Sequence, residues 1–332
     1  MRVLFVLVVA LFSASDAAYL ISYKFPGGNK LAEYSGNDMP FVNVTWAKSN
    51  FVNTLQMFLN DNATSILAYN DEPPPGAREN TTTSAHAKGL VVFINETSVV
   101  WIVHSIPRFP LVVNSTLDVR ALPAELKYGQ MALITEILPV KVMAPWIAQF
   151  IQTVQPNFYF KRVNNNNIPE QVTAAFNNNK KTTATSASFS YGPYKFFAKS
   201  KHYQNDLYSS LVAPHILGPN QTMYIQTWLN GDGGVLPSDP EHNIYNIDVV
   251  RIAASAPIST HADHSKWALA VGVDTNYWCI GDLNRIESQF ARGGQAICLS
   301  GEEFLHTIFL QAVISVTIPK PPLNKTFRDK EL

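Results

Sequence analysis

The chain contains the same short motif twice, as His86-Ala87-Lys88 and as His264-Ser265-Lys266. Each copy opens an apolar run, and a second matching stretch follows each run: residues 101–108 read WIVHSIPR, and residues 278–285 read WCIGDLNR. The spacing from His to Trp differs by one residue between the two copies. A repeat with one copy in each half of the chain predicts a duplicated fold, with a single site where the halves meet.

Each copy also has the pattern of a β-hairpin. Residues 90–94 and 99–103 are apolar and mostly β-branched, with polar residues between them, and residues 267–273 and 277–280 repeat this arrangement. The return strand of a hairpin ends beside the start of the outgoing strand, so the residues after each return strand are expected beside the motif of their own half. These residues are His104 and Ser105 in the first half, and Asp282 and Asn284 in the second.

Residues two apart on an extended strand point to the same side, so each motif can bring an imidazole and an ammonium group into one pocket. Two such pairs suit a phosphodiester. A neutral imidazole can attack phosphorus and form a phosphohistidine, and a protonated one can donate a proton to the departing oxygen. We expect Lys88, Lys266 and Asn284 to stabilise the phosphate charge without a metal ion. The sequence has no Cys/His cluster with zinc-ligand spacing.

Two HxK motifs resemble the phospholipase D superfamily, and several stretches resemble the deoxyribonuclease II family more closely. These stretches are residues 23–26 (YKFP), 86–89 (HAKG), 101–107 (WIVHSIP), 206–208 (DLY), 263–267 (DHSKW) and 279–285 (CIGDLNR). The resemblance implies an acid endonuclease that needs no divalent metal or cofactor and cleaves DNA to fragments with 3′-phosphates. It also implies an α/β fold, a phospholipase-D-like pseudo-dimer: two mixed β-sheet halves flanked by helices, with the active site at their interface.

The wider superfamily motif carries an Asp several residues after each Lys, where this chain has the apolar residues 91–94 and 270–273. Deoxyribonuclease II looks the same there, so the departure favours the narrower family. The resemblance assigns catalysis to the His and Lys of both motifs, namely His86, Lys88, His264 and Lys266. We expect His86 to be the nucleophile and His264 the general acid, although the pseudosymmetry leaves the reverse assignment open. His104, Ser105 and Asn284 are expected at the substrate phosphate, with a supporting role favoured for the first two.

The N-terminus has the pattern of a secretory signal peptide, residues 1–17, in which a basic residue precedes a short apolar run and small residues. This predicts a lysosomal or secreted protein with no membrane span. Cys279 and Cys298 are expected to form a disulfide in that oxidising route, the alternative being two buried free thiols. The chain has seven sequons for N-glycosylation, at Asn43, Asn62, Asn80, Asn95, Asn114, Asn220 and Asn324.

The formal net charge is zero at pH 7, which is unusual for a protein that binds DNA. In acid the eight histidines become protonated and carboxylates begin to neutralise. Binding to the phosphate backbone, with little sequence preference, is therefore expected to strengthen at low pH. The sequence leaves the oligomeric state open.

The predicted organisation is an N-terminal half at residues 18–163, a polar linker or surface loop at residues 164–188, and a C-terminal half at residues 189–332. Amphipathic helices are expected within residues 47–60, 144–154 and 302–316. Residues 71–83, rich in proline, are expected at the rim of the cleft. Lys24 and Lys199 are expected to be solvated, and Trp228 and Trp267 to pack in the core rather than stack on bases.

Two functions other than that of a nuclease are compatible with the motifs. One is a phospholipase D type of phosphodiesterase acting on lipid, which the stretch at residues 281–285 (GDLNR) argues against. The other is a secreted relative that binds DNA without cleaving it. Retention of both His and both Lys argues against that second alternative.

Overall fold

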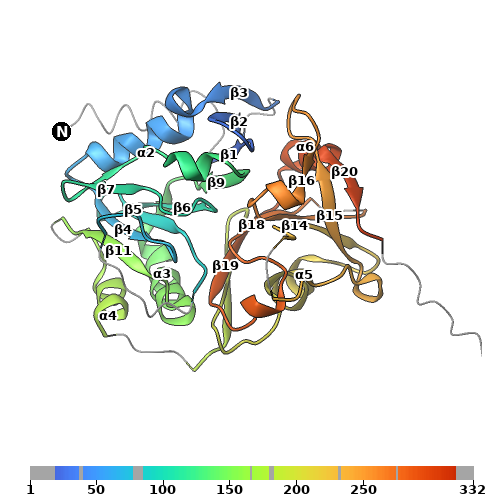
Figure 1. The fold of residues 1–332 in the computed structure, drawn as a ribbon. Coiled ribbons are helices and arrows are strands. Elements are labelled where there is room, and N and C mark those ends of the chain that lie inside the picture. The colour runs from blue at the N-terminus through green and yellow to red at the C-terminus, as the bar shows by residue number, and fades with distance from the viewer. Residues whose placement is uncertain are drawn as a thin grey trace, which may run out of the picture.

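The computed structural model describes residues 19–36, 40–77, 85–164, 167–178, 183–230, 233–273 and 276–318. The expected signal peptide and the sequons at Asn80 and Asn324 lie outside these residues. Two β-sheets, each accompanied by helices, stand side by side (Figure 1). The first sheet comes from residues 20–162 and the second from residues 186–316.

The first sheet contains β1 (Leu20–Lys24), β2 (Lys30–Tyr34), β3 (Val42–Thr45), β4 (Ser65–Tyr69), β5 (Gly89–Phe93), β6 (Ser98–His104), β9 (Gln130–Ile134), β10 (Leu138–Pro139) and β11 (Phe158–Arg162). The second contains β12 (Ser186–Tyr191), β13 (Tyr194–Lys199), β14 (Thr222–Gln226), β15 (Ile244–Val250), β16 (Ile258–Ser259), β17 (Trp267–Val271), β18 (Trp278–Gly281), β19 (Gly294–Leu299) and β20 (Val313–Val316). A separate hairpin joins β7 (Leu111–Val113) to β8 (Thr116–Asp118).

The α-helices are α2 (Asn50–Asn60), α3 (Val140–Val154), α4 (Glu170–Asn178), α5 (Ala213–Ile216) and α6 (Glu303–Ala312). Short 3-10 turns are η1 (Trp46–Lys48), η2 (Pro123–Leu126), η4 (Pro240–His242), η5 (Thr260–Ala262) and η6 (Glu287–Gln289), and η3 (Tyr208–Val212) is a π-helical turn. In the part of the chain that the structure describes, no helix is long and apolar enough to cross a membrane.

The strand order shows the duplication directly. The order β4-β5-β6-β9-β1-β2 of the first sheet is repeated in the second as β14-β17-β18-β19-β13-β12. The registers also correspond. The residue after each motif lysine pairs with the last residue of the neighbouring strand, Gly89 with Tyr69 of β4 and Trp267 with Gln226 of β14. The predicted α/β pseudo-dimer is therefore confirmed.

The two sheets differ at their outer strands. Every strand pairing described in the first sheet is antiparallel, whereas β14 and β15 of the second run parallel. The expectation of a mixed sheet is thus right for the second half and wrong for the first. A parallel neighbour needs a long crossover, and residues 227–243 connect β14 to β15.

One apolar core runs across both halves. Helix α3 lies between the sheets, and its Phe150 packs edge-on against Trp101 of β6, with ring centroids 4.9 Å apart. Trp101 also meets Phe196 of β13 at 5.9 Å, so residues of both sheets contact each other in this core. The halves are consequently held in a fixed relation by aromatic packing.

Two segments differ from the expectations. Residues 164–188 are not a plain linker: they contain α4, whose Val172 and Ala175 are buried against α3, and the first residues of β12. Val172 and Ala175 are three residues apart, a helical spacing that places both on one face of a helix although the segment is mostly polar. The helix expected at residues 302–316 ends at Ala312, and the β-branched residues that follow form β20 against β15.

The cysteine pair is a disulfide. Cys279 of β18 and Cys298 of β19 are direct neighbours in the ladder and are bonded to each other. The bond ties the return strand of the second hairpin to the next strand, just before the turn that holds Asn284.

Candidate active site

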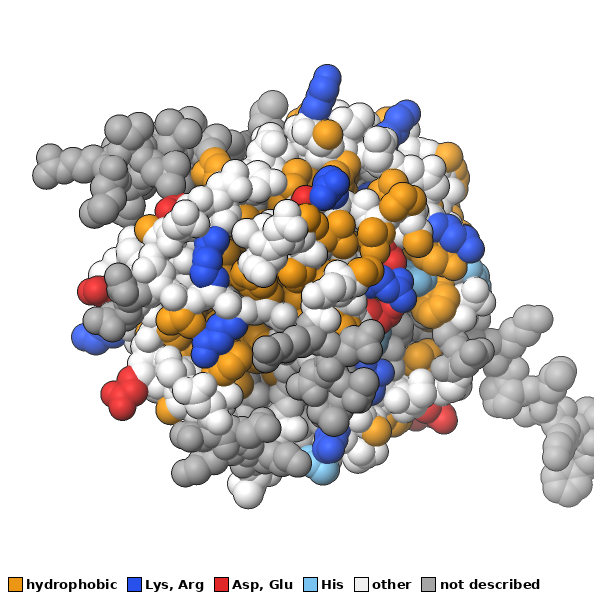
Figure 2. Space-filling view, turned by 60° about the vertical axis from the view of Figure 1, so that its left-hand side comes forward, with side chains coloured by type: hydrophobic (Ala, Val, Ile, Leu, Met, Phe, Trp, Pro, Cys, Tyr) orange, Lys and Arg blue, Asp and Glu red, His pale blue; other side chains and the backbone are white. Residues whose placement is uncertain are grey.

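Both HxK motifs line one cleft of about 530 Å³ between the two halves. The first half contributes Asp71, Glu72, His86, Lys88, Ser105 and Pro107, and the second contributes Trp228, His264, Lys266, Asn284, Ile286, Ser288, Gln289 and Arg292. On the face drawn in Figure 2, the Lys and Arg side chains stand apart from one another. The motif lysines, by contrast, are both buried in the cleft.

Each motif is positioned by the opposite half. The His86 N–H donates to the carbonyl of Gly293 at 2.8 Å, and the His264 N–H donates to the carbonyl of Gly129 at 2.9 Å. Only glycine fits at either position, because a Cβ at Gly293 would collide with the Val154 carbonyl and one at Gly129 with the Asp263 carboxylate. Neither motif can be placed correctly without the partner half.

Two buried lysines hold the loops that carry these glycines. Lys24 and Lys199 end equivalent strands, β1 and β13. The Lys24 Nζ donates to the Leu126 carbonyl at 2.9 Å, and the Lys199 Nζ donates to the Arg292 carbonyl at 2.7 Å. Burial lowers the pKa of both lysines to about 8. The expectation of solvated lysines is wrong, because backbone carbonyls replace water around these ammonium groups.

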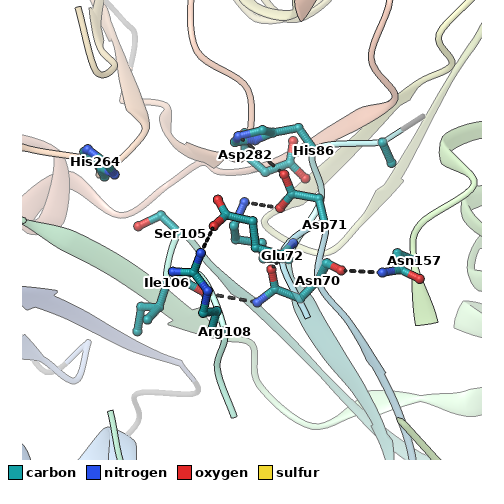
Figure 3. A network of polar contacts seen from close by, with 12 residues as sticks. Asn70, Asp71, Glu72, His86, Ser105, Ile106, Arg108, Asn157, His264 and Asp282 are labelled. Carbon is teal, nitrogen blue, oxygen red and sulfur yellow. Dashed lines mark hydrogen bonds and ion pairs between the residues drawn. The ribbon is translucent and has the colours of Figure 1, made fainter. Parts of the chain in front are cut away.

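His86 is held in one tautomer. Its Nδ1 lies 2.6 Å from the carbonyl oxygen of Asp282, and because a carbonyl only accepts, Nδ1 carries the hydrogen and donates. The lone pair therefore sits on Nε2, which lies 3.7 Å from Asp71 Oδ2. Figure 3 shows His86, Asp71 and Asp282 close together, with His264 facing them from the other side of the site.

Asp71 is a site residue that the sequence analysis missed. It follows β4 and forms ion pairs with Lys88 and with Arg292, whose Nη2 lies 3.3 Å from Oδ2. Burial opposes its ionisation, but His86, Lys88 and Arg292 together hold the pKa of Asp71 well below its usual value. The acidic partner that is absent from the apolar run after Lys88 thus comes from the neighbouring strand. No motif marks it, since it is a single Asp beside a proline-rich stretch.

His264 has a different environment from His86. Its ring stacks on Tyr128, with centroids 4.0 Å apart and planes 16° apart, and lies 4.3 Å from the Trp228 ring. Within the described chain its Nε2 has no hydrogen-bond partner. The Lys266 Nζ donates to the His264 carbonyl at 2.7 Å, which holds motif lysine and histidine backbone together.

The charges of the two motifs act on one another. Burial, and then Lys266 and Lys88, lower the pKa of His264 to about 3. Burial also lowers the pKa of His86 to about 3, with Asp71 opposing. Lys266, buried and beside Lys88, has its pKa lowered to about 7, while burial raises the pKa of Asp282 to about 7. The cleft therefore gains positive charge as the pH falls through 7.

The remaining predicted residues have mixed positions. Asn284 lies in the cleft, where its Oδ1 accepts the Trp228 N–H at 3.2 Å, leaving Nδ2 as the end that can donate to a phosphate. Ser105 also lines the cleft, but its hydroxyl donates to Gln130 Oε1 at 2.6 Å. His104 is fully buried behind it and does not line the cleft, so a direct phosphate contact is wrong for this side chain.

The tryptophans divide between core and cleft. Trp267 is fully buried, as expected, whereas Trp228 lines the cleft, so the expectation of core packing is wrong for Trp228. The Trp228 Nε1–H donates to the His261 carbonyl at 3.0 Å. The Asp263 carboxylate accepts from the Tyr23 hydroxyl at 2.7 Å and from the Ser265 N–H at 2.8 Å.

The described residues contain no group of three or more His, Cys, Asp or Glu side chains arranged to hold a metal ion. A second cavity, of about 1070 Å³, lies between the β1–β2 turn and residues 254–259. Lys30 and Lys48 line it, but no imidazole does. The concentration of titratable groups identifies the smaller cleft as the candidate active site.

Comparison with known proteins identifies the family of the chain. The Deoxyribonuclease II family model matches residues 27–317. Cell death-related nuclease 6 of Caenorhabditis elegans is 32% identical over 289 residues, covering 80% of this chain and 72% of that protein. Deoxyribonuclease-2-beta of Mus musculus is 28% identical over 335 residues, covering 88% of each. Among solved structures, yeast tyrosyl-DNA phosphodiesterase covers 70% of this chain and 69% of its own at 9% identity, with a TM-score of only 0.36.

Fold and cleft define a two-half protein with one composite histidine–lysine site. The chain belongs to the deoxyribonuclease II family. It is a nuclease, and DNA is its substrate.

Proposed function

We propose that the protein is an acid endodeoxyribonuclease that works without a divalent metal and forms a phosphohistidine on His86. The observation that carries this proposal is the hydrogen bond from His86 Nδ1 to the Asp282 carbonyl, 2.6 Å long, inside a cleft that also holds His264 and both motif lysines. It fixes the Nε2 lone pair of His86 for attack on phosphorus.

In the first step the His86 Nε2 bonds to phosphorus and the bond from phosphorus to O5′ breaks. Protonated His264 gives its proton to O5′, which leaves as a 5′-hydroxyl. In the second step neutral His264 takes a proton from water, and the resulting hydroxide displaces His86 and releases a 3′-phosphate. Lys88, Lys266 and Asn284 Nδ2 stabilise the charge on the non-bridging oxygens throughout.

The acid dependence follows from the pKa values in the cleft. Burial and neighbouring lysines lower the pKa of His264 to about 3, so the ring is mostly neutral at pH 5. The protonated fraction needed for leaving-group departure rises about tenfold for each pH unit of acidification above that pKa. His86, whose pKa is also lowered to about 3 by burial, stays largely neutral at pH 5 and remains a nucleophile. Protonation of Lys266 and Asp282 below about pH 7 strengthens phosphate binding.

The test is plasmid cleavage by purified protein at pH 5 and pH 7.5, with and without EDTA, beside His264→Ala. EDTA-resistant nicking that is faster at pH 5 and lost in the variant is expected. Cleavage abolished by EDTA would exclude the proposed chemistry, and DNA retention in a gel shift without cleavage would identify a non-catalytic relative. Hydrolysis of liposomal phospholipid instead of DNA would favour the phospholipase alternative.

The nucleophile is tested separately by trapping the covalent enzyme–DNA intermediate with labelled DNA in base. Phosphohistidine is acid-labile and base-stable, and the strand on the 5′ side of the scissile bond keeps the phosphate. Wild-type protein quenched in base during turnover is therefore expected to retain 5′-labelled DNA. His86→Ala is expected to retain none. Trapping by His86→Ala but not by His264→Ala would reverse the assignment of the two histidines.

We also infer that the protein enters the secretory pathway and reaches lysosomes or the exterior, where it degrades DNA from engulfed or dying cells. The signal-peptide pattern at residues 1–17 supports the route, as do the disulfide and the exposed sequons at Asn43, Asn62, Asn114 and Asn220. A loss of apparent mass after endoglycosidase treatment of protein collected from expressing cells is the expected result.

A further inference from the structure

The two ends of the cleft are chemically unlike. Gly89 and Trp267, which follow the two motif lysines, pair with Tyr69 and Gln226. Asp71 and Trp228 each lie two residues beyond these partners, so they occupy equivalent positions in the two halves. At the His86 end, this position holds a carboxylate paired with Lys88 and Arg292. At the His264 end, the same position holds an indole. One end is therefore charged and the other is aromatic.

Trp228 is the exception among the tryptophans. The other five of the six belong to the buried core, namely Trp46, Trp101, Trp146, Trp267 and Trp278. Trp228 is only partly buried and lines the cleft. Its ring is held by the bond from Nε1–H to the His261 carbonyl, 3.0 Å long, and its backbone N–H is bound by Asn284 at 3.2 Å. A fixed, partly open indole beside a catalytic imidazole is suited to stacking against a planar ligand.

The order of nucleophile and leaving oxygen along the cleft decides which nucleoside lies beside Trp228. In an in-line displacement the leaving oxygen lies opposite the nucleophile. With His86 on phosphorus and His264 at O5′, the nucleoside that carries O5′ must lie at the His264 end of the cleft. The nucleoside that keeps the 3′-phosphate lies toward Asp71 and Arg292.

We propose that Trp228 is a subsite for the nucleobase immediately 3′ of the scissile phosphate, an assignment that rests on the proposed roles of the two histidines. The base stacks on the indole and steers O5′ toward His264. Tyr128, whose ring is 6.4 Å from that of Trp228 and stacks on His264, backs the imidazole rather than the base. Since every base has a π-face, this subsite holds the substrate without selecting its sequence.

The test uses single-stranded oligonucleotides that carry one abasic residue and a label at one end, with cleavage measured at each bond. When the abasic residue lies 3′ of the scissile bond, the wild-type protein is expected to cleave that bond about tenfold less than in the intact strand, as for loss of one base stack. When the abasic residue lies 5′ of the scissile bond, the rate is expected to change little.

Two variants separate stacking from a general defect. Trp228→Ala is expected to cleave the intact strand about as slowly as the bond before the abasic residue, and to lose the difference between the two. Trp228→Phe keeps an aromatic face and is expected to keep most of that difference. A folding defect would slow all bonds alike and leave the ratio at the abasic residue unchanged.

Three results would overturn the subsite: no asymmetry around the abasic residue in wild type, asymmetry on the opposite side, or asymmetry that persists in Trp228→Ala. An enzyme that cleaves no DNA at all would instead contradict the proposed function. Base-stable trapping on His86 together with a symmetric abasic profile would leave the mechanism standing and remove only the subsite.

Discussion

At the scale of single residues, the two motif histidines share a sequence pattern but have different environments. His86 is bound through Nδ1 to a carbonyl and faces Asp71, whereas His264 lies between two aromatic rings with a free Nε2 among the described residues. Different environments should give the two histidines different roles, one as nucleophile and one as general acid. Substrates that differ in their leaving group can distinguish these roles.

A substrate with a good leaving group should bypass the general acid. His264→Ala is expected to cleave DNA about 10²- to 10⁴-fold more slowly, as for loss of general acid catalysis. In the first turnover it is expected to release p-nitrophenol from thymidine 3′-(p-nitrophenyl phosphate) at close to the wild-type rate, because nitrophenolate leaves without a proton. Later turnovers should be slow, because hydrolysis of the phosphohistidine needs His264 as a base. His86→Ala should lose both reactions. Equal losses on the two substrates for His264→Ala would contradict the assignment.

A second residue-scale prediction concerns Asp282, whose pKa burial raises to about 7 from a usual value of 3.8. A raised carboxyl pKa means that the folded state binds a proton more tightly, so its ionisation costs no stability below about pH 4 and costs the full amount above about pH 7. Asp282→Asn removes that cost. Its melting temperature is expected to exceed that of wild type by roughly 3–10 °C at pH 8 and to differ little at pH 4.

The same variant should change the pH dependence of cleavage. Asn resembles the protonated carboxyl and keeps the backbone carbonyl that binds His86, so the variant is expected to be active at pH 5. Its rate should fall less between pH 5 and pH 7.5 than that of wild type. A variant with an unchanged pH profile would indicate that Asp282 stays protonated over this range.

At the scale of elements, the sequence predicts what is local. The hairpins β5–β6 and β17–β18 and helix α3 follow from periodicity and turn residues, and the disulfide follows from the presence of two cysteines in an oxidising route. The contacts that complete the site do not, since the carbonyls of Gly129 and Gly293 and the carboxylate of Asp71 reach the motifs only after strands and halves have packed. The burial of Lys24 was also beyond prediction, because one of its carbonyl partners, Leu126, lies in a loop distant in sequence.

The loops held by the buried lysines give an element-scale prediction. Lys24→Met should loosen the loop that positions His264, and Lys199→Met the loop that positions His86. Each is expected to slow DNA cleavage about 10- to 100-fold. If the roles are as proposed, the first turnover of Lys24→Met should be largely rescued by the nitrophenyl substrate, and that of Lys199→Met should not.

Lys195→Met is the matched control for these lysine variants. Lys195 lies on the same strand as Lys199, but its Nζ donates to the His215 carbonyl at an exposed position. Its substitution is expected to leave both reactions near wild type. Equal loss in all three variants, or equal rescue of Lys24→Met and Lys199→Met, would mean that the lysines only support stability.

At the scale of the whole molecule, the shared core makes the halves interdependent. Trp146 of α3 stacks on Phe189 of β12, and Trp101 packs on Phe196, so a chain that ended at residue 178 would expose these rings. Such a fragment is expected to bind the dye ANS strongly and to lack nuclease activity. A soluble, monomeric fragment with a cooperative melting transition would show that the first half folds alone.

The exchange of glycine carbonyls between halves also bears on the origin of the enzyme. Two copies of a single half, associated as a dimer, could form the same reciprocal contacts, but symmetry would give both histidines identical neighbours. Each histidine would then have to act sometimes as nucleophile and sometimes as acid, with the same neighbours in both roles. Joining the copies in one chain removes that constraint, because a mutation no longer appears twice. The carboxylate at position 71 and the indole at position 228 are what such freedom produces.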